Sequence, residues 1–281
     1  MTQPALAKKG RGGWDSPRMY PWPPLPPHEF EVISVTSAIK KGLPTPHLIG
    51  WAAKVTAERA VDKYSYLGTV IAEAGEKEGI AWLKKARYDT ASEKADRGTV
   101  VHAAIEAYLA GKPFTKDQME EELRERRVPM ELWKSTAGMV SGAMEFLFDV
   151  EPDVIWSEAT VYSRTHQYAG TADLIAKVMI GGTMTPVIID FKTSKAIYDE
   201  VALQLAAYGR AEFVGRHDGS EQPLIPGHDG PIEHGIVIRP MASGRYERAD
   251  FALREDIFDT FLGCLAVANG LPALETARRP K

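Results

Sequence analysis

Asp190 and Lys192 are the two residues whose types and spacing first point to chemistry. They flank Phe191 at the end of the apolar run at 187–189, which has the composition of a buried strand. Side chains of a strand alternate between its two faces, so the carboxylate and the ammonium are expected on one face. The chain contains no other acid-x-Lys tripeptide. The tripeptide indicates a functional site because of its position at the end of a predicted strand.

A second acid, Asp173, lies in the segment that precedes this strand. The Gly-Gly pair at 181–182 suits a two-residue hairpin turn, because glycine readily adopts positive φ. In that register Ile180 faces Thr183, and Asp173 faces Asp190 with Cβ atoms roughly 4.5–5.5 Å apart. A longer turn would shift the pairing.

Two carboxylates this close repel each other, and a divalent cation would relieve the repulsion. Mg²⁺ is usually held by one or two carboxylates together with water and phosphate oxygens, so two aspartates suit it. Lys192 would then orient the attacking water and offset the charge that builds on a phosphate. The alternative is structural, with Asp173 and Lys192 forming a cross-strand ion pair on a solvated face.

Five further polar residues have positions that suit the same site. His102 and Glu106 are four residues apart and share one face of a predicted helix, where the imidazole is either a third metal ligand or packed in the core. Glu158, in a predicted strand, either flanks the site or lies on the surface. Gln204 and Tyr208 also share a helix face, and packing with one hydrogen bond is their simpler role.

The elements that must position these residues fall into two halves. Residues 1–29 are rich in Gly and Pro and are expected to form a flexible, extended tail. A single domain is expected over 30–270, mainly helical over 30–150 and with the order β-β-β-α-β-β-α over 151–270, followed by a basic tail over 271–281. Strands are predicted at 30–35, 155–163, 169–180, 186–192, 234–240 and 245–253, and helices at 48–63, 66–85, 92–109, 132–148, 199–214 and 255–268.

Composition excludes several classes of protein. The chain has 281 residues, of which 44% are hydrophobic and 26% charged, so it should fold; its net charge of −4 gives no global attraction to DNA, which would need a local basic patch. Cys264 is the single cysteine, which excludes an internal disulfide and a four-cysteine iron–sulfur or zinc site. No apolar stretch approaches the ~18 residues of a membrane span, and the opening residues lack a signal-peptide pattern. We therefore expect a cytoplasmic protein that binds no membrane.

Taken in order, these residues resemble the RecB-like branch of the PD-(D/E)XK nuclease superfamily, over about residues 95 to 210. The opening EVISVTSAIKKGLP is also similar to the N-terminal segment of phage-encoded and CRISPR-associated relatives. The motifs that carry the resemblance are His102 in RGTVVHAAIEAY, Glu158, Asp173 in GTAD, Asp190-Phe191-Lys192 in IIDFKTSK, and Gln204 with Tyr208 in QLAAY.

The resemblance implies a fold and a role for each residue. The fold would be α/β (α+β), with a central mixed β-sheet of the restriction-endonuclease-like type flanked by helices. His102, Asp173, Asp190 and the backbone carbonyl of Phe191 would bind Mg²⁺ or Mn²⁺, and the imidazole suits Mn²⁺. Lys192 would be the catalytic lysine, acting with Asp173 and Asp190. The resemblance makes Glu158, Gln204 and Tyr208 accessory or DNA-contacting residues. Glu106 is expected to join them because it shares the helix face of His102.

These implications lead to an expected function and two rivals. We expect a metal-dependent DNA nuclease, an exonuclease more than an endonuclease, that hydrolyses phosphodiesters in phage-type recombination, replication or repair and lacks an iron–sulfur cluster. No motor motif is present, so any unwinding or loading either comes from a helicase or single-strand-annealing partner or is unnecessary. The rivals are a non-catalytic DNA-binding or scaffolding member and an α/β protein whose charges form ordinary ion pairs. Basic residues expected near the DNA backbone are Lys54, Lys84, Lys85, Arg87 and Arg278-Arg279.

Overall fold

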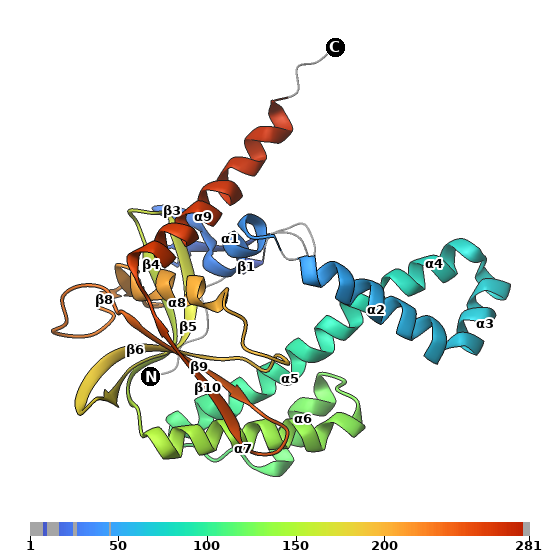
Figure 1. Ribbon diagram of the computed structural model, residues 1–281, viewed down its shortest axis with the longest axis horizontal. Helices are drawn as coiled ribbons and strands as arrows, with labels where there is room; N and C mark the ends of the chain where they lie inside the picture. Colours follow the sequence, from blue (N-terminus) through green and yellow to red (C-terminus); the bar gives the residue numbers. More distant parts are fainter. Residues whose placement is uncertain (1–7, 10–16, 25–26, 45, 278–281) are drawn as a thin grey trace.

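β5 (Tyr168–Ile180) is the strand around which the sheet is built (Figure 1). The computed structural model of the protein describes residues 8–9, 17–24, 27–44 and 46–277. Within them the strands form one mixed sheet in the order β1-β2-β3-β5-β4-β7-β8, and β6, β9 and β10 continue it from β5. The other strands are β1 (Lys8–Lys9), β2 (Arg18–Trp22), β3 (Phe30–Ser34), β4 (Asp153–Ser163), β6 (Thr183–Phe191), β7 (Phe213–Gly215), β8 (Glu221–Gln222), β9 (His234–Pro240) and β10 (Tyr246–Ala252).

The sheet divides along one edge of β5. On its other edge β5 pairs with β4 along most of its length. On the divided edge it pairs with β3 at Tyr168 and Ala169, and with β6 only from Leu174 onward. Residues 170–173 therefore have no partner on that edge among the described strands, which leaves the edge open to other groups there.

Helices cover both faces of the sheet. On one face α1 (Val35–Gly42), α8 (Val201–Gly209) and α9 (Glu255–Thr276) share a buried cluster with β5 and β6. On the other face α5 (Ala86–Leu109) and α7 (Trp133–Val150) share a second cluster with β5, β6 and β9. α6 (Lys116–Glu125) and the short 3₁₀ turn Met130–Leu132 connect α5 to α7. Each helix lies on the sheet because it carries an apolar face.

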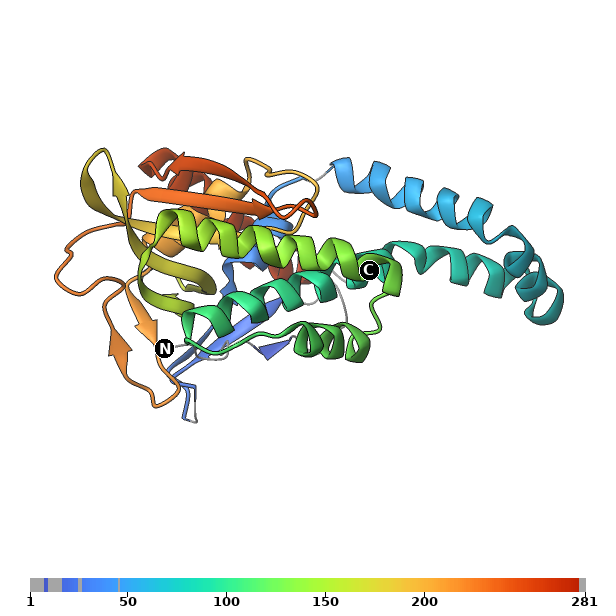
Figure 2. The same cartoon turned by 90° about the horizontal axis from the view of Figure 1, so that it is seen from below.

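Three helices project from the body as an arm in both views (Figures 1 and 2). They are α2 (Pro46–Asp62), α3 (Tyr64–Ala74) and α4 (Glu76–Lys84). The helix predicted at 66–85 is thus two helices, because Gly75 adopts a φ of 91° that a continuous helix does not allow. The helices expected elsewhere are present, but three differ in extent. The helix predicted at 92–109 begins at Ala86, the one predicted at 199–214 ends at Gly209, and the one predicted at 255–268 continues to Thr276.

Fold class is as expected at the coarse level, a mixed α/β structure with helices flanking a mixed sheet. One prediction at the N-terminus is wrong. The described part of residues 1–29, expected to be a flexible tail, contains β1 and β2, and Tyr20 and Trp22 in β2 are each only 1% exposed. Composition misled here, because the prolines and glycines around these aromatic residues favour extended chain without excluding a strand at the sheet edge.

The C-terminal boundary also differs from the prediction. α9 continues to Thr276, whereas the predicted helix ends at 268 and a tail begins at 271; Arg278-Arg279 lie outside the described residues. The stretch Glu255–Leu274 is long and apolar enough to cross a membrane by length and composition, contrary to the sequence-based expectation. Part of this apolar character serves the core, since Phe258, Phe261 and Leu265 are buried in the cluster shared with α8.

Candidate active site

Three neighbouring strands bring Glu158, Asp173 and Asp190 side by side. Ile180 pairs with Thr183, as predicted from the Gly-Gly turn, and the ladder of β5 with β6 keeps that register through Leu174 and Ile189. The next position along the two strands is Asp173 opposite Asp190. The glycines at 181–182 have φ values of 57° and 85°, as a two-residue hairpin turn requires.

On the other side of β5 the register places Glu158 opposite Asp173. Ser157 pairs with Leu174 and Ala159 pairs with Ala172, and Glu158 lies between them with a φ of 50°. This left-handed backbone conformation is uncommon for a residue with a side chain and is typical of functional positions. The row of three acids therefore crosses the sheet at the opening beside residues 170–173.

His102 reaches this row from α5. Its Nδ1 atom lies 3.2 Å from Oε1 of Glu158 and 3.9 Å from Oδ1 of Asp173. Val101 and Ile105, on the neighbouring positions of α5, are buried against the sheet and hold the helix close enough for this approach. One potential ligand atom from each of His102, Glu158 and Asp173 lies within 4.8 Å of the other two.

Burial and mutual repulsion shift the protonation of these groups. Burial, with further contributions from Asp190 and Glu158, raises the pKa of Asp173 to about 7. Burial alone would lower the pKa of His102, but the charge of Asp173 and the hydrogen bond and charge of Glu158 outweigh it and raise that pKa to about 9. The pKa of Glu106 is also raised, first by burial and then by Glu158.

Asp190 is held by Lys192 and Gln204. Its side chain is only 2% exposed, and the Lys192 Nζ atom lies 2.9 Å from Oδ1 and 2.8 Å from Oδ2. The Oδ2 atom has this ionic contact but accepts no hydrogen bond. Gln204 Nε2 donates to Oδ1 at 2.7 Å, while Gln204 Oε1 accepts from Lys192 at 3.3 Å. Burial opposes the charge of Lys192, yet Asp190 and Asp173 raise its pKa, so it stays an ammonium.

Backbone and packing contacts fix the remaining predicted residues. The Phe191 N–H donates to Oδ2 of Asp173 at 2.7 Å, which orients that carboxylate; the ligand role of the Phe191 carbonyl stays a prediction. Tyr208 is 2% exposed, and its ring lies so close to β5 that a Cβ atom on Gly170 would stand 2.4 Å from Cε1. Burial raises the pKa of Tyr208 well above its ordinary value, so its hydroxyl stays protonated.

All of the predicted site residues line one cavity of about 470 Å³. They come from α5, β4, β5, β6 and α8 and, for Lys192, from the position directly after β6, and they span more than a hundred residues of the chain. Nine further residues outside the predicted set line the same cavity, among them Arg18, Tyr20 and Thr36. The alternation of Arg18 and Tyr20 in an extended segment was the only local signal for two of them.

The donor set suits a divalent metal ion. An imidazole and two carboxylates within 4.8 Å of one another are ligand types that Mn²⁺ accepts, and Mg²⁺ accepts the carboxylates. The resemblance implies His102, Asp173 and Asp190 as side-chain ligands. In the structure Glu158 takes the place of Asp190 in the cluster, and Asp190 is held by Lys192 and Gln204. Burial, followed by the charges of Asp190 and Glu158, raises the pKa of Asp173, and a bound cation would favour its ionised form.

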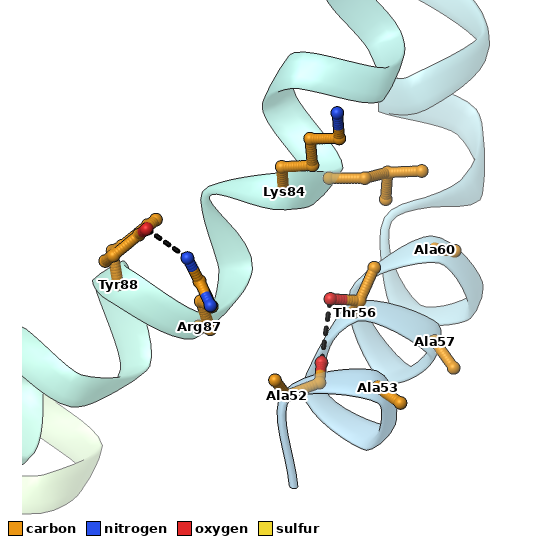
Figure 3. Close-up of a pocket in the computed structure, with 9 residues that line it drawn as sticks. Ala52, Ala53, Thr56, Ala57, Ala60, Lys84, Arg87 and Tyr88 are labelled. Atoms are coloured by element: carbon orange, nitrogen blue, oxygen red, sulfur yellow. Dashed lines mark hydrogen bonds between the residues drawn. The ribbon is translucent and has the colours of Figure 1, made fainter. Parts of the chain in front are cut away.

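Most of the basic residues predicted to contact DNA lie on the arm and not in this cavity. Lys84 and Arg87 line a second cavity of about 690 Å³ between α2 and the α4–α5 junction, opposite a row of alanines on α2 (Figure 3). Lys54 pairs with Glu58 at 3.6 Å, and Arg87 donates to the hydroxyl of Tyr88. Contact of these residues with DNA stays a prediction.

The chain matches no protein-family model and no curated protein. What it does must therefore be argued from the geometry of its own residues.

Proposed function

We propose that the protein is a metal-dependent DNA nuclease of the RecB-like branch of the PD-(D/E)XK superfamily, with a sheet of the restriction-endonuclease-like type. The observation that carries the proposal is the convergence of His102, Glu158, Asp173 and the Asp190–Lys192 pair on one cavity. An ordinary surface ion pair between Asp173 and Lys192 explains neither the buried imidazole nor the third carboxylate. Acid clusters of this kind at a cavity are typical of sites that hold a metal and a phosphate.

His102, Glu158 and Asp173 would hold the metal, and Asp190 adjoins them through its place opposite Asp173. A bound Mg²⁺ or Mn²⁺ supplies a Lewis acid for the phosphate and lowers the pKa of bound water. The Phe191 N–H keeps the Asp173 carboxylate turned toward His102, so the ligand atoms do not have to reorganise when substrate arrives.

Lys192 provides the positive charge that the protein itself places at the reacting phosphate. Asp190 and Gln204 hold its ammonium on two sides, while the side chain stays about one third exposed to the cavity. An ammonium in this position binds a nonbridging oxygen or orients the attacking water, and it stabilises the negative charge that grows in the transition state. We expect an exonuclease, as the resemblance implies.

A cleavage assay with matched variants tests the proposal. Lys192→Ala should lower the rate of DNA hydrolysis in Mg²⁺ or Mn²⁺ by at least about 10²-fold, because it removes a charge needed in the transition state, while DNA binding largely survives. Lys177→Ala is the control, since Lys177 lies on β5 but does not line the cavity. EDTA should stop the reaction in the unmodified protein.

End-labelled linear DNA and circular DNA are compared in the same assay. An exonuclease leaves circles intact, and labels at either end report the direction of digestion. Full activity of Lys192→Ala would exclude this site. DNA binding without any cleavage by the unmodified protein would instead support a non-catalytic member of the same fold.

A further inference from the structure

We propose that Arg18 binds a phosphate group of the DNA in the candidate cavity, an inference that rests on the proposed nuclease function. Arg18 belongs to β2, the segment in which the sequence predicted a flexible tail. Neither the motifs nor the resemblance pointed to this residue.

The position of Arg18 follows from strand alternation and from two anchors. Arg18 and Tyr20 lie on the same face of β2, and both line the cavity that contains Asp173 and Lys192. The Tyr20 hydroxyl is 3.0 Å from Oγ1 of Thr171, next to the open stretch of β5. The Arg18 backbone N–H donates to Oγ of Ser37 at 3.0 Å, which ties β2 to the first turn of α1.

Within the part of the chain that the structure describes, the charge of Arg18 has no acidic partner. Arg18 and Lys192 are the two lysine or arginine side chains that line the cavity among the described residues. Lys192 is occupied by Asp190 and Gln204, whereas the Arg18 guanidinium makes no ion pair or hydrogen bond with any described residue. This lack of partners is notable because acids stand on the same cavity, which makes an anion brought by the substrate the expected partner.

The chemistry of the side chain suits a phosphate. A guanidinium presents paired N–H donors that match two oxygens of one phosphate, and it is always charged. Thr36, in the first turn of α1, adds a hydroxyl to the same wall of the cavity. One phosphate of a DNA strand would then bind beside the acids and Lys192, and a second phosphate of the same DNA strand would bind at Arg18. The second phosphate is either a terminal group or an internal diester, which share this chemistry.

Binding is measured first, without metal and without cleavage. Fluorescence anisotropy of a labelled oligonucleotide in EDTA, over a series of salt concentrations, gives Kd and its salt dependence. Arg18→Ala should raise Kd about tenfold and reduce the slope of log K against log salt by about 0.7–0.9, the contribution of one phosphate. Arg18→Lys should restore the slope, because the charge returns, but only part of the affinity.

Arg245→Ala is the matched control, since Arg245 pairs with Glu145 on an exposed part of the β9–β10 connection and does not line the cavity. It should bind DNA like the unmodified protein. Substrates with a 5′-phosphate, a 3′-phosphate, hydroxyl ends only, or a closed circle identify the phosphate. If Arg18 contacts a terminal phosphate, Arg18→Ala and the unmodified protein should have the same Kd on substrates that lack that phosphate. If it contacts an internal phosphate, Arg18→Ala should raise Kd equally on every substrate.

Two results overturn the inference, and they are distinguishable. If the unmodified protein neither binds nor cleaves DNA, the proposed function and the role of Arg18 both fail. If the unmodified protein cleaves DNA and Lys192→Ala does not, but Arg18→Ala shows unchanged Kd and salt slope, only the role of Arg18 fails. Circular dichroism and urea unfolding of each variant show whether a loss of binding reflects loss of the fold.

Discussion

Glu158 has a backbone conformation that its side chain makes unfavourable. Glu158 has a φ of 50°, whereas the residues on either side of it, Ser157 and Ala159, pair regularly with β5. The flanking pairs hold the strand in place, so the strained residue persists and directs its carboxylate to Nδ1 of His102. Such strain costs of order 1–3 kcal/mol and is commonly found where it positions a functional group.

Comparison of two substitutions at this position separates strain from charge. Glu158→Gly should be more stable to urea than Glu158→Ala by about 1 kcal/mol, because glycine adopts positive φ without a steric penalty. Both variants lose the carboxylate, so calorimetry should show weaker Mn²⁺ binding for both relative to the unmodified protein. Equal stability of the two variants would show that the left-handed conformation carries no strain.

β2 closes one end of the hydrophobic core. Trp22 packs against Tyr162 and Phe213, with ring centroids 4.9 Å and 5.2 Å apart, and its Nε1 donates to Glu221 at 3.1 Å. A Cβ atom on Gly215 in β7 would stand 2.4 Å from this indole, so the glycine leaves the room that the indole needs. The element is therefore part of the folded domain, and it is also the element that carries Arg18.

Removal of the Trp22 side chain tests this role of β2. Trp22→Ala should lower the free energy of unfolding by about 3–5 kcal/mol, since the indole is almost fully buried and leaves a cavity. Trp51→Ala, on the partly exposed helix α2, should cost clearly less. Urea unfolding followed by circular dichroism measures both, and an equal or smaller loss for Trp22→Ala would contradict the packing argument.

The stability of the whole molecule depends on pH because the fold gathers several acids around the imidazole of His102. Folding raises the pKa of His102 from 6.5 to about 9, so the stabilisation it provides is fully present below pH 6.5 and is lost as the pH rises through 9. Folding also raises the pKa of Asp173 from 3.8 to about 7, so its unfavourable charge develops as the pH rises between those values. The two effects have the same sign.

Stability of the protein in EDTA should therefore fall as the pH rises from 6 to 9. Mn²⁺ should oppose the fall and bind more tightly at higher pH, because it needs a neutral imidazole and ionised carboxylates. Thermal or urea unfolding at several pH values, with and without Mn²⁺, checks both statements. Asp173→Asn should flatten the dependence, and a stability that rises over this range in EDTA would contradict the assignment of charges.

Local pattern alone determined most of the elements and one register. Alternating and helical periodicity predicted the central strands and helices, and the Gly-Gly pair at 181–182 predicted how β5 meets β6, because these features depend on residues close together in the chain. That register, together with the motifs of the resemblance, predicted Asp173, Asp190 and Lys192 at one place.

Tertiary structure alone decided the rest of the site. Three contacts show this: Glu158 with His102, Gln204 with Asp190, and Trp22 with Glu221. They join residues that lie between 14 and 199 positions apart. No local pattern encodes such contacts, because each depends on where the sheet divides and which helix packs over the opening. Arg18 enters the cavity for the same reason: β3 and α1 place its strand there, and composition around it indicates only extended chain.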